Sequence, residues 1–322
     1  MKNKQWLGVG LLLLASFFWG STFVAQSETQ VGPFTYLAMR SWVAVVFLSP
    51  VALIADILKK KNNNSEGSAQ ESSKLLVAGG VICGIVLFLA SALQQVGISR
   101  GTQAGKAGFI TAMYLLIVPA LGLFMKKPVR PLLWGCIGVS FVGLFLLCMT
   151  GNLTEFSLKA LLSAENLSTL RLEAGDVYVF GCAVVFSFHI LMVDKLSPKV
   201  DCIKLSLLQF ATVAVVASVC MFMFENPHVS EIISSWVSII YAGVLSSSVA
   251  YTLQIFGQKY TQPALASMLM SFESSFAVLS AIVFSFFTTG KSTLPTAYEW
   301  LGIALMFAAI MLAQLPEKKK NS

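Results

Sequence analysis

The chain has 322 residues, of which 56% are hydrophobic and only 11% are charged. Soluble domains carry about a quarter of charged residues, so this composition excludes an ordinary soluble protein and indicates a membrane protein. One crossing of the hydrocarbon core takes about 20 residues, and ten crossings would leave no room for a separate soluble catalytic domain. The formal net charge of +7 is therefore interpreted as a topology signal and not as a nucleic-acid-binding surface.

Apolar stretches bounded by charged residues, glycine or proline predict ten transmembrane helices. In chain order they cover residues 6–26, 33–58, 75–97, 102–125, 132–149, 175–193, 202–224, 236–256, 264–288 and 298–315. The first stretch is too long for the apolar core of a signal peptide, and no small-residue cleavage site is evident, so we assign it as a span. The predicted fold class is an all-α integral membrane protein.

The positive charges predict the orientation of these helices. If the N-terminus is cytoplasmic, sixteen of the 22 Lys and Arg residues fall in cytoplasmic segments, five fall outside, and Arg40 lies within a span. This asymmetry follows the positive-inside rule and predicts a multi-pass protein of the bacterial plasma membrane with both termini in the cytoplasm. Asp194, Lys195, Asp201 and Lys204 cluster at one cytoplasmic turn, where helix capping and solvated ion pairs are expected.

Two short patterns recur 159 or 160 residues later, as Leu93-Gln94-x-x-Gly97 and Leu253-Gln254-x-x-Gly257, and as Thr102-Gln103 and Thr261-Gln262. Because a unit of five helices is odd, a second copy enters the membrane inverted relative to the first. The predicted architecture is therefore ten transmembrane helices in two inverted five-helix repeats. We expect the first repeat at 1–150, an outer connecting loop at 151–174 and the second repeat at 175–322.

Two connections differ from the short loops between the other spans. The cytoplasmic stretch 59–73 is polar and low in complexity, which is typical of a mobile linker. The outer stretch 151–174 alternates apolar and charged residues. A short amphipathic helix on the membrane surface and an irregular loop are both compatible with that pattern.

Several segments together carry a family resemblance: Ala-Ser-Phe-Phe-Trp-Gly-Ser-Thr-Phe-Val-Ala-Gln at 15–26, Pro33, Arg40, Leu93-Gln94-x-x-Gly97 and Trp-Leu-Gly-Ile-Ala-Leu at 300–305. They resemble the EamA family of the drug/metabolite transporter superfamily over nearly the whole chain. The resemblance implies two inverted repeats, a central cavity walled mainly by helices one to four and six to nine, and transport of amino acids, metabolites or drugs, often outward. The sequence departs from the commonest pattern at 186–189, where Phe-Ser-Phe-His replaces a Trp-containing segment, and this leaves the substrate open.

Two ionisable side chains lie deep inside predicted spans, where a charge costs about 2.5–3.5 kcal/mol at the bilayer centre. Glu273 follows Pro263 by ten residues and falls near the midplane, whereas Arg40 follows Pro33 by seven and lies nearer the outer surface. In the functional interpretation, Glu273 binds a proton or a substrate ammonium group, and Arg40 neutralises it or binds a carboxylate. The alternatives are a structural ion pair and an arginine that reaches the interface.

Four further side chains are candidates for the same substrate path. The repeat offset places Tyr114 opposite Glu273, where it can donate a hydrogen bond to a substrate. Trp19 can stack on an apolar or cationic substrate, His189 can titrate near neutral pH, and Gln94 can line the path. Each also has a structural interpretation, which is packing for Trp19 and interhelical hydrogen bonding for His189 and Gln94.

Signatures of other mechanisms are missing from the sequence. The Gly-Lys-Ser at 290–292 lacks the upstream glycine of a phosphate-binding loop, and HExxH, CxxC and GxSxG do not occur. We therefore expect no ATP, no cofactor, no metal and no enzyme activity. The predicted function is secondary transport, with export of amino acids or small amphipathic metabolites by alternating access, and the alternative is an integral membrane enzyme or scaffold. The expected partners are a small-molecule substrate and the lipid bilayer, with protons and a second copy in a homodimer as further candidates.

Overall fold

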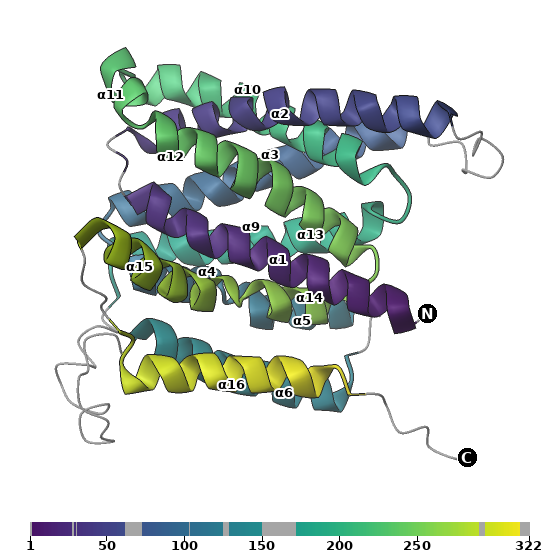
Figure 1. Cartoon of the computed structure of the whole chain (residues 1–322), viewed down its shortest axis with the longest axis vertical. Helices are drawn as coiled ribbons and strands as arrows, with labels where there is room; N and C mark the ends of the chain where they lie inside the picture. Colours follow the sequence, from purple (N-terminus) through teal and green to yellow (C-terminus); the bar gives the residue numbers. More distant parts are fainter. Residues whose placement is uncertain are drawn as a thin grey trace.

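The computed structural model describes residues 2–27, 29, 31–61, 73–102, 104–124, 129–149, 172–289 and 294–315. In chain order the helices are α1 (Lys2–Ser27), α2 (Pro33–Lys61), α3 (Ser73–Ser99), α4 (Ala104–Thr111), α5 (Tyr114–Phe124), α6 (Pro131–Met149), α9 (Ala174–Leu196), α10 (Cys202–Phe224), α11 (Val229–Ser234), α12 (Trp236–Tyr241), the π-helical segment η1 (Ala242–Ala250), α13 (Tyr251–Gln258), α14 (Pro263–Met270), α15 (Glu273–Thr289) and α16 (Ala297–Ala313). The long helices lie side by side, and α1 begins at the end of the bundle where α16 ends (Figure 1).

The predicted all-α membrane fold is confirmed. Within the described ranges, nine segments are long and apolar enough to cross a membrane, and α16 is a tenth apolar helix of 17 residues. Most of the predicted linker at 59–73 and of the predicted outer loop at 151–174 lies outside the described residues, so their conformations stay predictions. The short helix α11, in the connection after α10, was not expected from the sequence.

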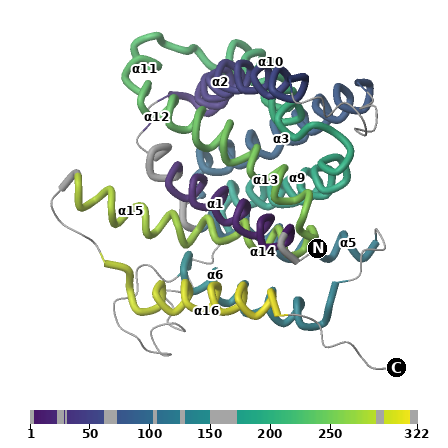
Figure 2. Tube along the Cα trace, turned by 45° about the vertical axis from the view of Figure 1, so that its right-hand side comes forward, coloured from purple at the N-terminus to yellow at the C-terminus, as the bar shows by residue number. Residues whose placement is uncertain are grey.

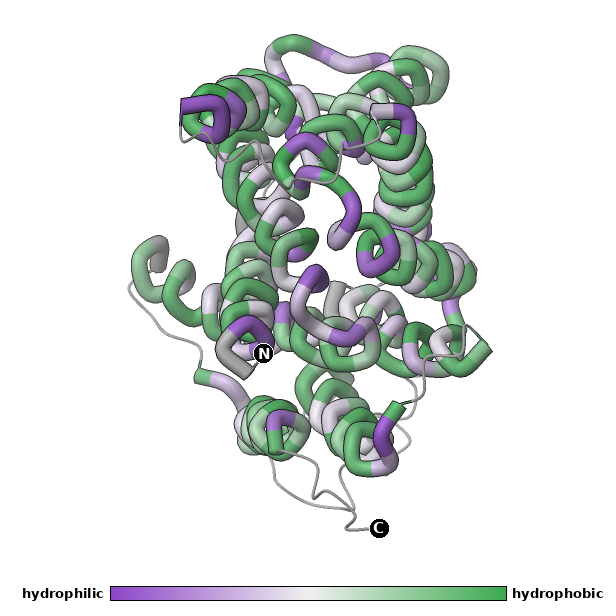
Figure 3. The backbone as a smooth tube through the Cα atoms, turned by 90° about the vertical axis from the view of Figure 1, so that its right-hand side faces the viewer, coloured by the Kyte–Doolittle hydropathy of each residue, from purple (hydrophilic) through white to green (hydrophobic). Residues whose placement is uncertain are grey.

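Outward-facing positions of the bundle are apolar. Seen from the end at which α1 begins, the helices are coloured hydrophobic over most of their length (Figure 3). Large side chains such as Val46, Leu53 and Phe222 are 71%, 65% and 74% exposed. A soluble surface rarely carries so much contiguous apolar area, whereas a bilayer solvates it at no cost.

The fourth and ninth predicted spans are each interrupted by one tight turn. α4 ends at Thr111 and α5 begins at Tyr114, while α14 ends at Met270 and α15 begins at Glu273. At both turns the backbone closes i→i−3 hydrogen bonds, from the residue 113 N–H to the residue 110 carbonyl at 3.1 Å and from 272 to 269 at 3.3 Å. The continuous helices expected at 102–125 and 264–288 are therefore each two helices joined by a 3₁₀-type turn.

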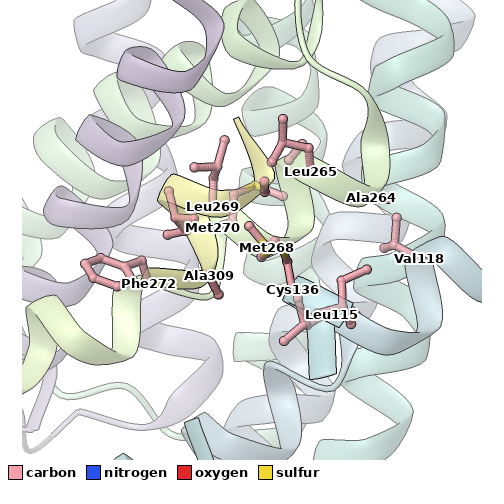
Figure 4. Close-up of a cluster of buried hydrophobic side chains, with 14 of the residues drawn as sticks. Leu115, Val118, Cys136, Ala264, Leu265, Met268, Leu269, Met270, Phe272 and Ala309 are labelled. Atoms are coloured by element: carbon pink, nitrogen blue, oxygen red, sulfur yellow. The ribbon is translucent and has the colours of Figure 1, made fainter. Parts of the chain in front are cut away.

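The two interrupted helices meet in the largest cluster of buried apolar side chains. Met268 and Leu269 of α14 lie in this cluster with Leu115 of α5, Cys136 of α6 and Ala309 of α16 (Figure 4). Close packing on both sides holds each half-helix in place across its turn. Both turns are thus supported by protein and not by lipid.

The eighth predicted span, at 236–256, is also irregular. Its central part is the π-helical segment η1, between α12 and α13. The Ser248 hydroxyl donates to the carbonyl of Gly243, five residues earlier, at 2.8 Å. π-Helical turns are rare and occur frequently at functional sites.

The recurring sequence pattern marks equivalent helix crossings. Near the start of α9, a Cβ on Gly175 would overlap the carbonyl oxygen of Gly97 in α3. Near the start of α1, a Cβ on Gly8 would overlap the carbonyl oxygen of Gly257 in α13. Because α1 and α9 are the first helices of the two repeats and enter the membrane from opposite ends, the same contact closes both ends of the bundle.

A buried ion pair reinforces only one of these crossings. Lys106 Nζ of α4 lies 2.6 Å from Asp176 Oδ2 of α9, and the two side chains are 10% and 3% exposed. The Thr102 hydroxyl donates to Asp176 Oδ1 at 3.0 Å, and the Glu173 backbone N–H donates to Oδ2 at 2.9 Å. The carboxylate therefore has a partner for each oxygen, as a buried charge requires.

Capping and exposed ion pairs form at the turn between α9 and α10, as predicted. Asp201 caps α10 by accepting hydrogen bonds from the Ile203 and Lys204 backbone N–H groups at 2.9 and 3.1 Å. It also pairs with Lys59 of α2, and Lys204 Nζ lies 2.9 Å from Asp56 Oδ1. Burial disfavours the Asp201 carboxylate, but these hydrogen bonds, above all the one from Lys59, outweigh it and lower the pKa of Asp201.

α6 and α16 form a closely packed pair at the edge of the bundle (Figures 1 and 2). A Cβ on Gly143 of α6 would lie 2.7 Å from the Gly302 carbonyl oxygen and 2.8 Å from Met306 Cγ. Reciprocally, a Cβ on Gly302 of α16 would overlap the Gly143 carbonyl oxygen. Such close backbone approach is a common source of helix association in membranes, since it maximises van der Waals contact.

We expect Gly143→Ala to lower the free energy of unfolding by about 1–3 kcal/mol, because the added methyl group meets backbone that cannot move aside. Gly135→Ala is the matched control on the same helix, where no heavy atom lies within 4 Å of the added Cβ. The control should leave thermal unfolding of the purified protein unchanged or raise its midpoint, since alanine favours the helix. Equal midpoints for the two variants would contradict the described contact between α6 and α16.

Candidate functional site

A buried cavity lies where the interrupted helices meet the first helices of both repeats. The volume that water-sized molecules can occupy in it is about 80 Å³. It is lined by Trp19, Thr22, Arg40, Ser91, Gln94, Thr111, Tyr114, Phe186, Ile190, Ser246, Tyr251, Gln254, Met270 and Glu273. The lining combines aromatic rings, neutral polar groups and two ionisable side chains of opposite sign. The sequence-predicted residues Trp19, Arg40, Gln94, Tyr114 and Glu273 are therefore brought together.

Equivalent positions of the two repeats line this cavity in pairs. Four pairs separated by 159 or 160 residues and one separated by 167 line it: Ser91 and Tyr251, Gln94 and Gln254, Thr111 and Met270, Tyr114 and Glu273, and Trp19 and Phe186. The cavity thus lies between the repeats, near the axis that relates them. Four of the five pairs combine different residue types, so the chemistry of the cavity comes from differences between the copies.

Glu273 and Tyr114 occupy matching places at the two helix interruptions. Each is the first residue of the second half-helix, α15 or α5. The Tyr114 hydroxyl donates to Glu273 Oε1 over 3.4 Å, a long hydrogen bond. The N-terminus of a helix also carries a partial positive charge that favours a carboxylate. Gly20 of α1 packs against the Glu273 backbone, since a Cβ there would meet its carbonyl oxygen at 2.6 Å.

Arg40 reaches the cavity from α2 without forming an ion pair. Its Cζ lies 5.8 Å from the centre of the Tyr36 ring, and its buried Nε has no hydrogen-bond partner. Among the residues that the structure describes, no acidic side chain forms a salt bridge with Arg40. The structural Arg40–Glu273 ion pair considered above is therefore not formed, although both side chains line the same space.

Aromatic rings form the apolar part of the wall. The ring centres of Trp19 and Tyr251 are 4.9 Å apart, with the planes inclined by 66°. The Trp19 Nε1–H is buried and has no acceptor in the protein. These rings offer an apolar surface, and the indole adds one hydrogen-bond donor for a bound molecule.

His189 lies behind the cavity wall and does not line it. The side chain is fully buried, and its Nε2 lies 3.2 Å from Gln209 Oε1 of α10. The rings of Phe186 and Tyr251 lie edge-on to it at 6.4 and 6.2 Å between centres. Its observed contacts are those of the structural interpretation, namely an interhelical hydrogen bond. Gln94, by contrast, lines the cavity and donates from Nε2 to Thr111 Oγ1 at 3.0 Å.

Sequence reasoning missed two large contributors to the wall, Tyr251 and Gln254. For Gln254 the signal was present, because the recurring Leu-Gln-x-x-Gly pattern pairs it with Gln94. For Tyr251 there was none, since its partner position holds Ser91, a small residue common in transmembrane helices.

A second cavity of about 530 Å³ lies toward the end of the bundle at which α1 begins. Its walls come from α5, from the last turn of α9 and from the α13–α14 connection, and include Asp194, Gln258 and Lys259. Gln258 lines this second cavity, whereas Gln254, one turn earlier in α13, lines the first. One helical turn of buried side chains thus separates the two spaces.

The sequence matches the EamA-like transporter family twice, over residues 6–149 and again over 173–315. The chain belongs to the EamA-like transporter family. Both matches follow the repeat inferred from the recurring patterns, and the two-repeat architecture of this family is therefore present. As an EamA-like transporter, the protein is a membrane transporter that handles a small-molecule substrate within a lipid bilayer.

Known relatives agree with this assignment. An uncharacterized transporter from Archaeoglobus fulgidus is 24% identical, over 97% of this chain and 87% of its own length. A protein of known crystal structure is 16% identical, with a TM-score of 0.69 over 95% of this chain and 96% of the other. The second similarity shows a shared fold. Neither relative identifies what the EamA-like transporter described here carries.

Proposed function

We propose that this EamA-like transporter is a secondary carrier that exports zwitterionic amino acids, or amphipathic metabolites of similar size, by alternating access. The observation that supports it most is the presence of Arg40 and Glu273 in one buried cavity with no ion pair between them. An ionisable side chain buried in a membrane protein is costly unless it has a function or a partner. A zwitterion supplies a partner for each of them.

The arrangement of polar groups suits such a molecule. A substrate carboxylate can bind the Arg40 guanidinium and the Trp19 Nε1–H, both of which have buried donors without an acceptor. An ammonium group can bind Glu273, and an apolar side chain can pack against Trp19, Tyr251 and Phe186. A phosphate fits less well, because Arg40 is the one basic side chain in the lining of this cavity.

Three features support alternating access. The two repeats close opposite ends of the bundle through equivalent glycine contacts. Discontinuous helices of each repeat begin their second halves at the cavity, as in transporters that bind substrate near the membrane midplane. Positions that are equivalent in the two repeats line the cavity in five pairs, so a bound substrate would lie between the repeats.

Counterflow into liposomes tests the proposed substrate class. Vesicles that contain the protein and are loaded with unlabelled phenylalanine should accumulate labelled phenylalanine from outside. A pooled panel of amino acids should then define which substrates are carried. Arg40→Gln should weaken uptake by about tenfold or more, because it removes a charge-assisted hydrogen bond to the carboxylate. Lys60→Gln, which changes an exposed basic residue of the same helix, is the matched control. Correctly folded protein that moves no member of the panel would favour the enzyme or scaffold alternative.

We infer that Glu273 exchanges a proton for the charge of the substrate and so couples transport to pH. Glu273→Gln resembles the protonated carboxyl group in shape and should keep substrate exchange while removing the pH dependence of net transport. Tyr114→Phe, which removes the 3.4 Å hydrogen bond but keeps the carboxyl group, should retain that dependence. A Glu273→Gln protein with wild-type pH dependence would exclude this residue and direct attention to His189.

We also propose that both termini face the cytoplasm of a bacterial cell. The distribution of Lys and Arg supports this orientation, as does the position of the α1 start and the α16 end at one end of the bundle (Figure 1). Single cysteines at Ser65 and Asn321, both outside the described residues, should react with a membrane-impermeant thiol reagent only in inside-out vesicles. Reaction of either cysteine in intact cells would contradict the proposed orientation.

A further inference from the structure

Two glutamines on successive turns of α13 form a short hydrogen-bonded chain beside the cavity. Gln254 Nε2 donates to Gln258 Oε1 at 3.1 Å, and Gln258 Nε2 donates to the backbone carbonyl oxygen of Ile190 in α9 at 2.9 Å. Both side chains are 2% exposed. The remaining acceptor of these two side chains, Gln254 Oε1, is buried and has no hydrogen-bond partner among the residues that the structure describes.

The direction of this chain is fixed by its anchor. The Ile190 carbonyl can only accept, so Gln258 must present its NH₂ group to it. The Gln258 oxygen then faces Gln254, which in turn must donate with its own NH₂ group. Reversing either amide would bring two acceptors or two donors together. Gln254 is therefore held with its carbonyl oxygen unused, and Gln254 is a lining residue of the central cavity.

We propose that Gln254 is a specificity-determining residue, whose Oε1 accepts a hydrogen bond from the ammonium group of a bound zwitterion, and that Gln258 is its positioning residue. This inference rests on the proposed function. A buried carbonyl without a donor is unfavourable, and a substrate N–H group in the cavity satisfies it. If the two glutamines served only to join α13 to α9, the bond from Gln258 to Ile190 would suffice and Gln254 would need no fixed orientation.

The proposed contact adds selectivity that charge alone does not provide. An ammonium group has three N–H donors, so it can bind the Glu273 carboxyl group and Gln254 Oε1 at the same time. A quaternary ammonium group carries the same charge but has no N–H donor, and it would leave Gln254 Oε1 unpaired. Sites built to hydrogen-bond an N–H group discriminate strongly against analogues that lack it. The neutral amide keeps this preference whether Glu273 is protonated or not.

Competition binding tests the inference. Labelled phenylalanine bound to purified protein in lipid nanodiscs is displaced by phenylalanine and by its N,N,N-trimethyl analogue, and the ratio of the two affinities is compared between variants. Wild-type protein should prefer phenylalanine by about tenfold or more, and Gln254→Leu should lower that ratio about fivefold, the value of one hydrogen bond. Gln258→Met leaves Gln254 in place but frees its amide, and should lower the ratio by a smaller factor.

The control is Gln314→Leu, the same change at the C-terminal end of α16, away from the lining of the cavity. It should leave the ratio unchanged, and thermal unfolding should show that all three variants are folded. Wild-type ratios in folded Gln254→Leu and Gln258→Met proteins would overturn the inference while leaving the proposed function intact. Failure of the wild-type protein to bind phenylalanine or any other zwitterionic amino acid would overturn the proposed function, and this inference with it.

Discussion

Inside a bilayer, every backbone N–H and C=O group must find its partner within the protein, because lipid offers none. The architecture of this transporter depends on that constraint. Straight helices satisfy it wherever the bundle faces lipid, so irregular backbone can occur only where protein surrounds it. The two interrupted helices obey this rule, since their turns before Tyr114 and Glu273 are packed against the core on one side and line the cavity on the other. The constraint thus confines unusual local structure to the place where a ligand can use it.

The internal duplication determines which positions line the cavity, and the sequence differences between the two repeats determine which chemical groups those positions carry. Symmetry alone would line the cavity with matched residues, as it does for Gln94 and Gln254. Where the copies differ, Tyr114 of the first repeat corresponds to Glu273 of the second, and Trp19 corresponds to Phe186. A symmetric cavity would have no preferred direction for a polar substrate. Among the lining residues the differences leave one carboxyl group, on Glu273, and one guanidinium group, on Arg40, which in the proposed function would bind the two ends of a zwitterion.

How much of this was predictable follows from what a sequence encodes. Depth in the membrane can be counted along a helix at 1.5 Å per residue, and this count places Glu273 near the midplane and Arg40 nearer the outer surface. Both side chains line the same cavity. Hydropathy predicts the spans well because, in the part of the chain that the structure describes, nine of them are long and apolar and the tenth, α16, is an apolar helix of 17 residues. The direction in which a side chain points is a different matter. A helix that is apolar all round gives no periodic signal of its inner face. For that reason the sequence did not place His189 behind the wall or Tyr251 in it.

The helix interruptions were likewise invisible in the sequence. Each turn keeps its hydrogen bonds by tightening them to i→i−3, so it needs no glycine or proline at the break. The π-helical segment in the eighth span was also not predictable from the local composition. There the Ser248 hydroxyl donates a hydrogen bond to the carbonyl group five residues earlier. The internal repeat is the better guide to such interruptions, because a helix interruption before Glu273 implies an equivalent interruption before Tyr114.

The ion pair between Lys106 and Asp176 makes the two ends of the bundle thermodynamically unequal. At the equivalent crossing near the start of α1, the corresponding positions hold Val9 and Leu265, both buried in the apolar core. Opening the crossing between α3 and α9 hydrates the charges of Lys106 and Asp176. Opening the crossing between α1 and α13 exposes apolar surface to water. Polar hydration lowers the heat capacity and apolar hydration raises it. In the proposed alternating access, exchange between conformations open at opposite ends would therefore carry a heat-capacity change, so temperature itself would alter the balance between the two faces of the membrane.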